Sequence, residues 1–192
     1  MTPLSQLLRA KIADDHQEIE QTPIVLSMMN GSITRDRYRN LLAQLLPVHE
    51  ACDANVISLA IPDLANACQR SETIQADLTF FGRVGSTVTH PAAVEFTLLI
   101  PGLSKTALLG VAYVVAGSRM GSRVLEPLLR RGLSLADSNG LTYHQTPPQF
   151  ALQWRQILTA LDLLDLTRLE QDDVVNAAAF CMHSLLVIFR DA

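Results

Sequence analysis

The sequence predicts a single all-α domain of about eight helices over residues 1–192. Three observations support this prediction. Apolar residues recur at spacings of three and four along most of the chain, which is the period of a helix with one buried face. Prolines, glycines and threonines separate these segments and mark their ends. No segment alternates apolar and polar side chains as a half-buried strand does.

The first segment predicts an amphipathic helix, because one of its faces carries at helical spacing Leu4, Leu8, Ile12, His16 and Ile19. Thr22 and Pro23 supply a cap and a first-turn proline for a short second helix that ends near Asn30–Gly31. Thr34 caps a long third helix, and Pro47 is expected to bend it. The remaining helices are expected over 64–83, between Pro91 and Pro101, over 103–131, from Pro147–Pro148 to 163, and over 170–190.

The amino-acid composition indicates a globular protein and argues against several other classes. Apolar residues make up 48% of the chain and charged residues 18%, which is typical of a globular domain. A net charge of -4 argues against a nucleic-acid surface, and three cysteines without a CxxC motif argue against a disulfide framework. The N-terminus does not resemble a signal peptide, and the most apolar region, 96–117, is too interrupted to span a membrane. We therefore expect a soluble, cytoplasmic protein without a membrane or nucleic-acid partner.

Gly117 and Gly121 lie one helical turn apart inside an otherwise apolar helix. A glycine in a helix interior costs about 0.5–1 kcal/mol relative to alanine, so the pair needs a reason. One is a tight crossing with another helix. The other is a backbone that approaches a flat ligand and kinks over it. The spacing alone leaves both open.

His16 is followed one turn later by Glu20. It is either a core histidine bonded to its neighbour or a metal or haem ligand whose second ring nitrogen is held by the carboxylate. The other histidines lack the spacing of a zinc site, and no glutamate has a histidine three residues later as a di-iron bundle requires. A single histidine suits haem, which brings its own four equatorial ligands.

Three further side chains could hold a ligand with carboxylates. Arg9 lies two turns before His16, Tyr113 lies one turn before Gly117, and Arg155 opens the helix after the paired prolines. Each could be a solvated surface group. Together they could bind the two propionates of a haem, because a guanidinium pairs with a carboxylate in a fork geometry.

Three segments resemble the biliverdin-producing haem oxygenases, in the bacterial branch linked to phytochromes. They are "LLRAKIADDHQEIEQTPIVLSMMNGSITRDRYRNLLAQLLPVHEACD", "YVVAGSRMGSRVL" and, more weakly, "GLTYHQTPPQFALQWRQIL". They follow the family's order, and the number of helices agrees. The resemblance implies a haem oxygenase fold and oxidative opening of haem to biliverdin, with release of carbon monoxide and ferrous iron. Haem would be both cofactor and substrate, electrons would come from a ferredoxin-like or flavoprotein donor, and a bacteriophytochrome could receive the biliverdin.

The resemblance also implies roles at matching positions. His16 would be the proximal iron ligand, with Glu20 as its orienting neighbour. The backbone around the two glycines would lie against the haem face, where amides and ordered water steer bound oxygen. The full set of implied residues is Gly117, Ser118, Gly121 and Ser122 for catalysis, and His16, Glu20, Arg9, Tyr113 and Arg155 for haem binding.

Two positions depart from the family pattern: Ser122 replaces a second glycine, and Tyr143–His144 replace paired aromatic residues. Both bear on turnover more than on fold, so a haem-binding or interaction protein without turnover is the alternative. A helical enzyme of thiamine salvage is a third possibility. It would need a reactive thiol, whereas Cys52, Cys68 and Cys181 all lie in apolar helical contexts.

Overall fold

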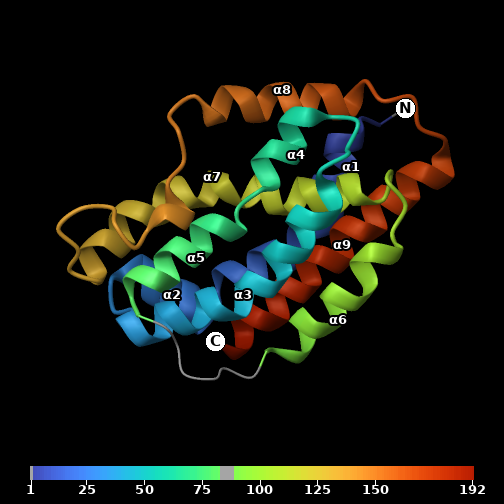
Figure 1. Cartoon of the computed structure of the whole chain (residues 1–192). Coiled ribbons are helices and arrows are strands. Elements are labelled where there is room, and N and C mark those ends of the chain that lie inside the picture. Colours follow the sequence, from blue (N-terminus) through green and yellow to red (C-terminus); the bar gives the residue numbers. More distant parts are fainter. Residues whose placement is uncertain (1, 83–88) are drawn as a thin grey trace.

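A computed structural model describes residues 2–82 and 89–192. Its described residues form nine α-helices and two short 3-10 helices without a strand (Figure 1), which confirms the predicted all-α class. The elements are α1 (Leu4–Glu20), α2 (Pro23–Asn30), α3 (Arg35–Val56), α4 (Pro62–Cys68), α5 (Ser71–Phe80), α6 (Pro91–Leu99), η1 (Ile100–Gly102), α7 (Leu108–Gly132), η2 (Thr142–His144), α8 (Phe150–Asp162) and α9 (Arg168–Asp191).

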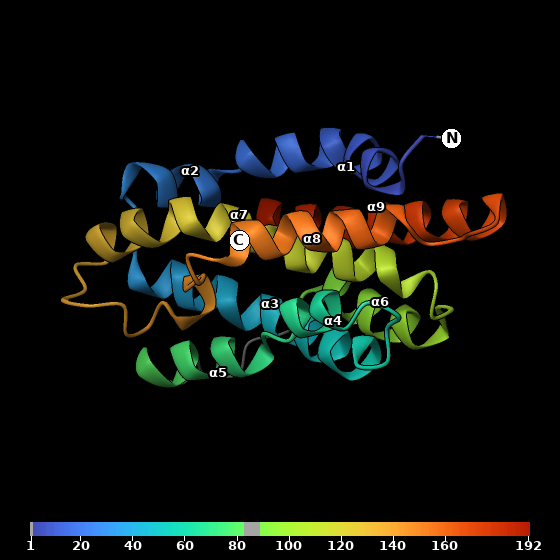
Figure 2. The ribbon, with the colours of Figure 1, turned by 90° about the horizontal axis from the view of Figure 1, so that it is seen from above.

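The helices form three layers (Figure 2). Helices α1 and α2 make the upper layer in this view, α7, α8 and α9 the middle layer, and α3 to α6 the lower layer. Helix α9 connects the layers, because it packs extensively against both α1 and α7 and also contacts α3 and α6. Helix α8 crosses α1, α4 and α7 at one side of the molecule. The two helices that carry the predicted site, α1 and α7, therefore share α9 as their support.

The core is built from apolar faces at helical spacing. Helix α3 buries Leu41, Leu45, Val48 and Cys52 along one face. The largest fully buried side chains include Tyr38, Phe96 and Phe150, which come from three different helices. The core is therefore shared among the layers and is continuous through the molecule.

The close crossing of α7 and α9 depends on Gly110. A Cβ atom at this position would lie 1.9 Å from the carbonyl oxygen of Val174 and 2.8 Å from the backbone nitrogen of Ala178, both in α9. No side chain fits there, so the backbones of α7 and α9 are in direct contact. The tight helix crossing considered for Gly117 and Gly121 is thus made by α7 two turns earlier.

The helix predicted over 64–83 is two helices, α4 and α5, and residue 83 lies outside the described residues. The break falls at Gln69 and Arg70, whose backbones leave the helical region. The Asp53 carboxylate accepts the backbone N–H groups of Arg70, at 3.2 Å, and of Ser71, at 2.9 Å. These bonds from α3 satisfy the free N–H groups at the start of α5. A tertiary contact therefore divides a segment whose local sequence favours one helix.

Other helix ends follow local sequence with one exception. Thr22 stands at the N-cap position of α2, but its hydroxyl donates to the Ile19 carbonyl and does not cap the helix as predicted. Thr34 caps α3 by accepting the N–H of Arg37, as predicted. Thr167 and Glu170 form a reciprocal capping box at the start of α9. Helix α9 is also the one described helix whose length and apolar composition would suffice to cross a membrane, and 44% of that apolar stretch is buried within the fold.

Candidate functional site

His16 lies on the exposed side of α1. Its side chain is 57% exposed, and Nδ1 lies 3.5 Å from a carboxylate oxygen of Glu20. No described residue bonds to the second ring nitrogen, Nε2. The buried residues of α1 are Leu4, Leu8 and Ile12, so the apolar face stops being buried one turn before His16. His16 is therefore not a core histidine, and its carboxylate neighbour leaves one nitrogen available to a ligand.

The two glycines of α7 differ in their surroundings. A Cβ atom at Gly121 would meet nothing within 4 Å, whereas one at Gly117 would lie 3.3 Å from the ring of Trp154 in α8. Gly121 is also exposed. No close approach within the described chain therefore explains Gly121, and its open surface is available to a ligand.

Arg9 and Tyr113 are brought together from α1 and α7. Burial raises the pKa of the Tyr113 hydroxyl, and the positive charge of Arg9 opposes that rise. The Tyr113 ring packs against Trp154 of α8, with ring centroids 5.5 Å apart. Arg155 follows Trp154, is exposed, and donates from Nε to the carbonyl of Ala151 at 3.4 Å. The three predicted propionate-binding residues thus come from helices that meet at this side of the molecule.

The two predicted serines face different surroundings. Ser118 is exposed, and its hydroxyl donates to the Val115 carbonyl at 2.7 Å. Ser122 is 3% exposed and donates at 3.5 Å to the carbonyl of Ser118. One residue is about 100° of helix rotation, so the Ser122 side chain leaves α7 in a different direction from the open surface at Gly121. The hydroxymethyl group at Ser122 is held inside the protein.

A buried polar network beneath Ser118 was not predicted from the sequence. Arg70 is 3% exposed and donates from Nη1 to the Ser118 hydroxyl at 3.1 Å and from Nη2 to the Tyr143 carbonyl. Its guanidinium carbon lies 4.0 Å from the centre of the Tyr143 ring. The Tyr143 hydroxyl is 3.0 Å from Nε2 of His49. Burial lowers the pKa of Arg70, and it lowers the pKa of His49 to about 3, so His49 is neutral at physiological pH.

Asp77 anchors the loop that carries Tyr143. Its two carboxylate oxygens accept the backbone N–H groups of Thr142 at 2.7 Å and Tyr143 at 2.9 Å. Burial raises the pKa of Asp77 and these hydrogen bonds oppose the rise. A sequence signal for this network existed, because Arg70, Ile74 and Asp77 share one helical face. Charged residues on a core-facing stripe indicate a buried polar site.

The family model described as heme oxygenase matches residues 2–191. The chain belongs to the haem oxygenase family. A "Heme oxygenase" of Takifugu rubripes is 25% identical, over 98% of this chain and 73% of the relative. The solved haem oxygenase of Leptospira interrogans superposes with a TM-score of 0.87 at 20% identity, covering 100% of both chains.

Two haem oxygenase structures from the cyanobacterium Synechocystis have the same fold. Heme oxygenase-1, solved in complex with heme, gives a TM-score of 0.83 at 16% identity, covering 99% of this chain and 92% of that chain. Heme oxygenase-2, solved with heme and NO, gives 0.85 at 19% identity, covering 99% and 85%. The family resemblance predicted from three sequence segments is thus confirmed over nearly the whole chain.

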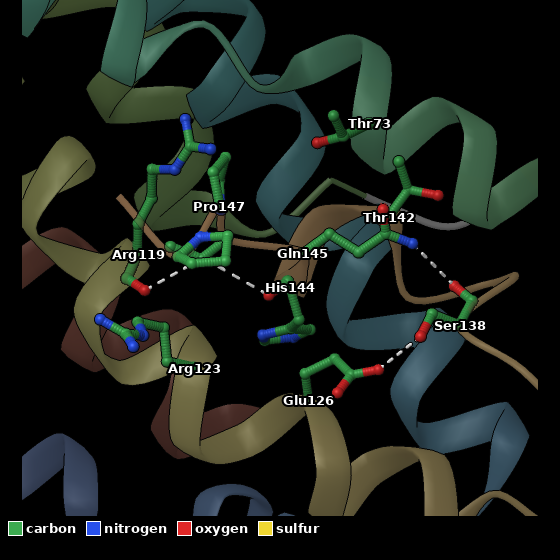
Figure 3. A pocket seen from close by; sticks show the side chains of 11 residues that line it. Thr73, Arg119, Arg123, Glu126, Ser138, Thr142, His144, Gln145 and Pro147 are labelled. Carbon is green, nitrogen blue, oxygen red and sulfur yellow. Dashed lines mark hydrogen bonds between the residues drawn. The ribbon is translucent and has the colours of Figure 1, made fainter. Parts of the chain in front are cut away.

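A cavity of about 620 Å³ lies between α7 and the loop that follows it (Figure 3). Arg119, Arg123 and Glu126 line it from α7, on the helix face turned away from Gly117 and Gly121. Its other wall is the loop that includes His144 and Pro147 (Figure 3). None of the residues that the family resemblance assigns to haem lines this cavity. The chemistry of the site therefore favours the exposed face at Gly121 over this cavity.

The thiols of this family member do not form a reactive site. Cys52, Cys68 and Cys181 are fully buried and unpaired. Burial raises the pKa of each thiol well above its ordinary value, which suppresses the nucleophilic thiolate. The thiol chemistry required by a thiamine-salvage enzyme is therefore not supported.

Proposed function

We propose that this haem oxygenase family member opens the haem ring to biliverdin and releases carbon monoxide and ferrous iron. Support comes from the family match over residues 2–191 and from two structural relatives solved in complex with heme. The observation that carries the proposal is His16, an exposed histidine with one ring nitrogen paired to Glu20 and the other free. We further propose that the whole chain acts as one domain, in the cytoplasm.

His16 and Glu20 fit the proximal side of a haem. A neutral imidazole binds iron through one nitrogen, and a carboxylate on the other nitrogen fixes its orientation and raises its basicity. The free Nε2 and the Glu20 contact at 3.5 Å provide this pairing. We assign Nε2 of His16 to the haem iron.

Arg9, Tyr113 and Arg155 fit the propionates. None of the ion pairs among the described residues involves Arg9 or Arg155. Tyr113 keeps a neutral hydroxyl beside Arg9, since burial raises its pKa. Two guanidinium groups without an ion pair and one hydroxyl donor match two carboxylates. Holding these carboxylates would fix the rotation of the haem and hence the meso carbon that is presented.

The backbone from Gly117 to Ser122 fits the distal side. Gly121 leaves the surface of α7 open, and the Ser118 hydroxyl is exposed beside it. When bound and reduced, haem supplies the iron that activates oxygen for attack on its own ring. The role of α7 is to bring its backbone groups and the Ser118 hydroxyl close to the distal side of the haem. The buried Ser122 hydroxyl donates to the Ser118 carbonyl and so supports this segment from inside the protein. Electrons would come from a ferredoxin-like or flavoprotein donor, and a bacteriophytochrome would be a recipient for biliverdin.

The proposal is tested by adding hemin to the purified protein and then a reductant in air. We expect a Soret band that decays into the broad absorption of biliverdin. A stable Soret band would identify a haem carrier without turnover, and the absence of a Soret band would refute the proposal.

His16→Ala tests the iron ligand, and His183→Ala is its matched control. His183 is also exposed and also lies beside a carboxylate, with Nδ1 3.3 Å from Asp15. We expect His16→Ala to shift the Soret band and retain the helical far-UV spectrum, and His183→Ala to leave the Soret band unchanged. Identical Soret spectra in all three proteins would remove His16 from its assigned role.

A further inference from the structure

Arg70 carries a buried positive charge that forms no ion pair with a described carboxylate. Two other arginines of the same chain do form ion pairs, the half-buried Arg39 with Asp36 and the exposed Arg190 with Glu18. Burying a charge without a counter-charge is unfavourable, so Arg70 calls for an explanation beyond packing.

Two carboxylates that act electrostatically on Arg70 accept their hydrogen bonds from backbone groups. Asp53 accepts the backbone N–H groups of Arg70 and Ser71. Asp77 accepts those of Thr142 and Tyr143. The guanidinium itself bonds to two neutral oxygens, the Ser118 hydroxyl and the Tyr143 carbonyl, and lies over the Tyr143 ring. Asp53 and Asp77 act on the guanidinium charge only through space, so the groups in contact with that charge are all neutral.

Ser118 links the buried guanidinium of Arg70 to the surface of α7. Nη1 of Arg70 reaches the Ser118 hydroxyl from inside the protein, while Ser118 is exposed on α7 between Gly117 and Gly121. Gly121 adds no side chain on that surface. The charge of Arg70 therefore acts through Ser118 at the part of α7 where the backbone is bare.

We propose that Arg70 is a positioning residue that makes this face of α7 favour anionic over neutral ligands of a haem iron bound to His16. The inference rests on the proposed function. Arg70 orients the Ser118 hydroxyl. This hydroxyl donates its proton to the Val115 carbonyl and accepts a hydrogen bond from Nη1 of Arg70, so the positions of its proton and of one lone pair are both fixed. Its charge stabilises negative charge at the adjacent surface, because the protein around it screens weakly.

The test compares two exogenous ligands of the ferric haem complex, azide as an anion and imidazole as a neutral molecule. Their dissociation constants are measured by Soret titration in the wild type, Arg70→Gln and Arg70→Lys. Arg70→Gln keeps a hydrogen-bond donor and removes the charge, and Arg70→Lys keeps the charge. We expect Arg70→Gln to weaken azide binding roughly tenfold with imidazole binding unchanged, and Arg70→Lys to preserve both. Equal changes for azide and imidazole in Arg70→Gln would overturn the proposal.

Variants at the exposed Ser118 test the same charge without altering a buried residue. In Ser118→Asp a carboxylate stands beside the guanidinium and neutralises it, so the preference for azide over imidazole should be lost. Ser118→Asn is the matched uncharged control and should retain that preference. Retention of the azide preference in Ser118→Asp would also overturn the proposal. A protein that binds no haem refutes the proposed function, whereas one that binds haem with an unaltered ligand preference in Arg70→Gln refutes only the role of Arg70.

Discussion

Replacing Gly110 by alanine should destabilise the protein more than any other glycine-to-alanine change in α7. The new Cβ would lie 1.9 Å from the Val174 carbonyl oxygen and 2.9 Å from its carbonyl carbon. Both atoms belong to the backbone of α9, which cannot rotate away as a side chain can. Helices α7 and α9 would have to separate by about 1 Å or more to restore van der Waals contact.

The expected magnitude follows from two opposing effects. Overpacking a core costs about 1–3 kcal/mol, and more when the obstacle cannot move. Alanine returns about 1 kcal/mol through its higher helix propensity. Because the obstacle is backbone, the cost lies at the upper end, about 3 kcal/mol, so we expect a net loss of about 2 kcal/mol, which lowers the melting temperature by roughly 4–8 °C in a chain of this size.

Thermal unfolding followed by far-UV circular dichroism measures this loss. Gly121→Ala is the matched control, because its Cβ meets nothing within 4 Å. It should raise the stability of the ligand-free protein by up to about 1 kcal/mol. A Gly110→Ala protein that melts at or above the temperature of Gly121→Ala would show that the α7–α9 crossing is not the constraint we infer.

Two further predictions concern buried titratable groups. Burial lowers the pKa of His144 to about 3. Between pH 6.5 and this value the histidine is protonated in the unfolded chain but neutral in the folded chain, so the free energy of unfolding falls as the pH drops below 6.5. The loss at pH 5 is about 2 kcal/mol for each such histidine. His49 behaves similarly, so His144→Phe should remove about half of the change in the urea midpoint between pH 7 and pH 5, and an unchanged pH dependence would contradict this. The three buried thiols should resist alkylation at pH 8 in the native protein and react after denaturation, and modification without unfolding would count against their burial.

Much of the fold could be predicted because its helices are bounded by local signals. Gly31 has a φ of 76° at the end of α2, where a glycine is favoured, and Thr34 caps α3. The division of α4 from α5 was not predicted, because the deciding contact comes from Asp53, 17 residues before Arg70. Local periodicity contains no information about such a partner.

The candidate site was predictable where residues stand in recognisable short motifs. His16 with Glu20, and Gly117 with Gly121, were found in this way. The shared helical face of Arg70 and Asp77 was a signal for a buried polar site, but their partners Tyr143 and His49 could not be predicted, because they come from other segments that only tertiary structure brings near. The close approach at Gly110 was also missed, since a single glycine in an apolar run does not reveal which backbone lies opposite.

The uneven burial of α1 has a consequence for its motions. All three of its buried residues lie in its first nine positions, and beyond Ile12 only Ile19 packs partly against the core. The half that bears His16 pairs with α9 at the surface, Asp15 with His183 and Glu18 with Arg190, and surface ion pairs contribute little free energy. We therefore expect this half of α1 to open locally at a free energy below that of global unfolding. A molecule bound at His16 would add contacts to this half of α1 and stabilise its closed state. Ligand affinity and the amide exchange rates of residues 13–20 should therefore both depend on the same opening equilibrium of α1.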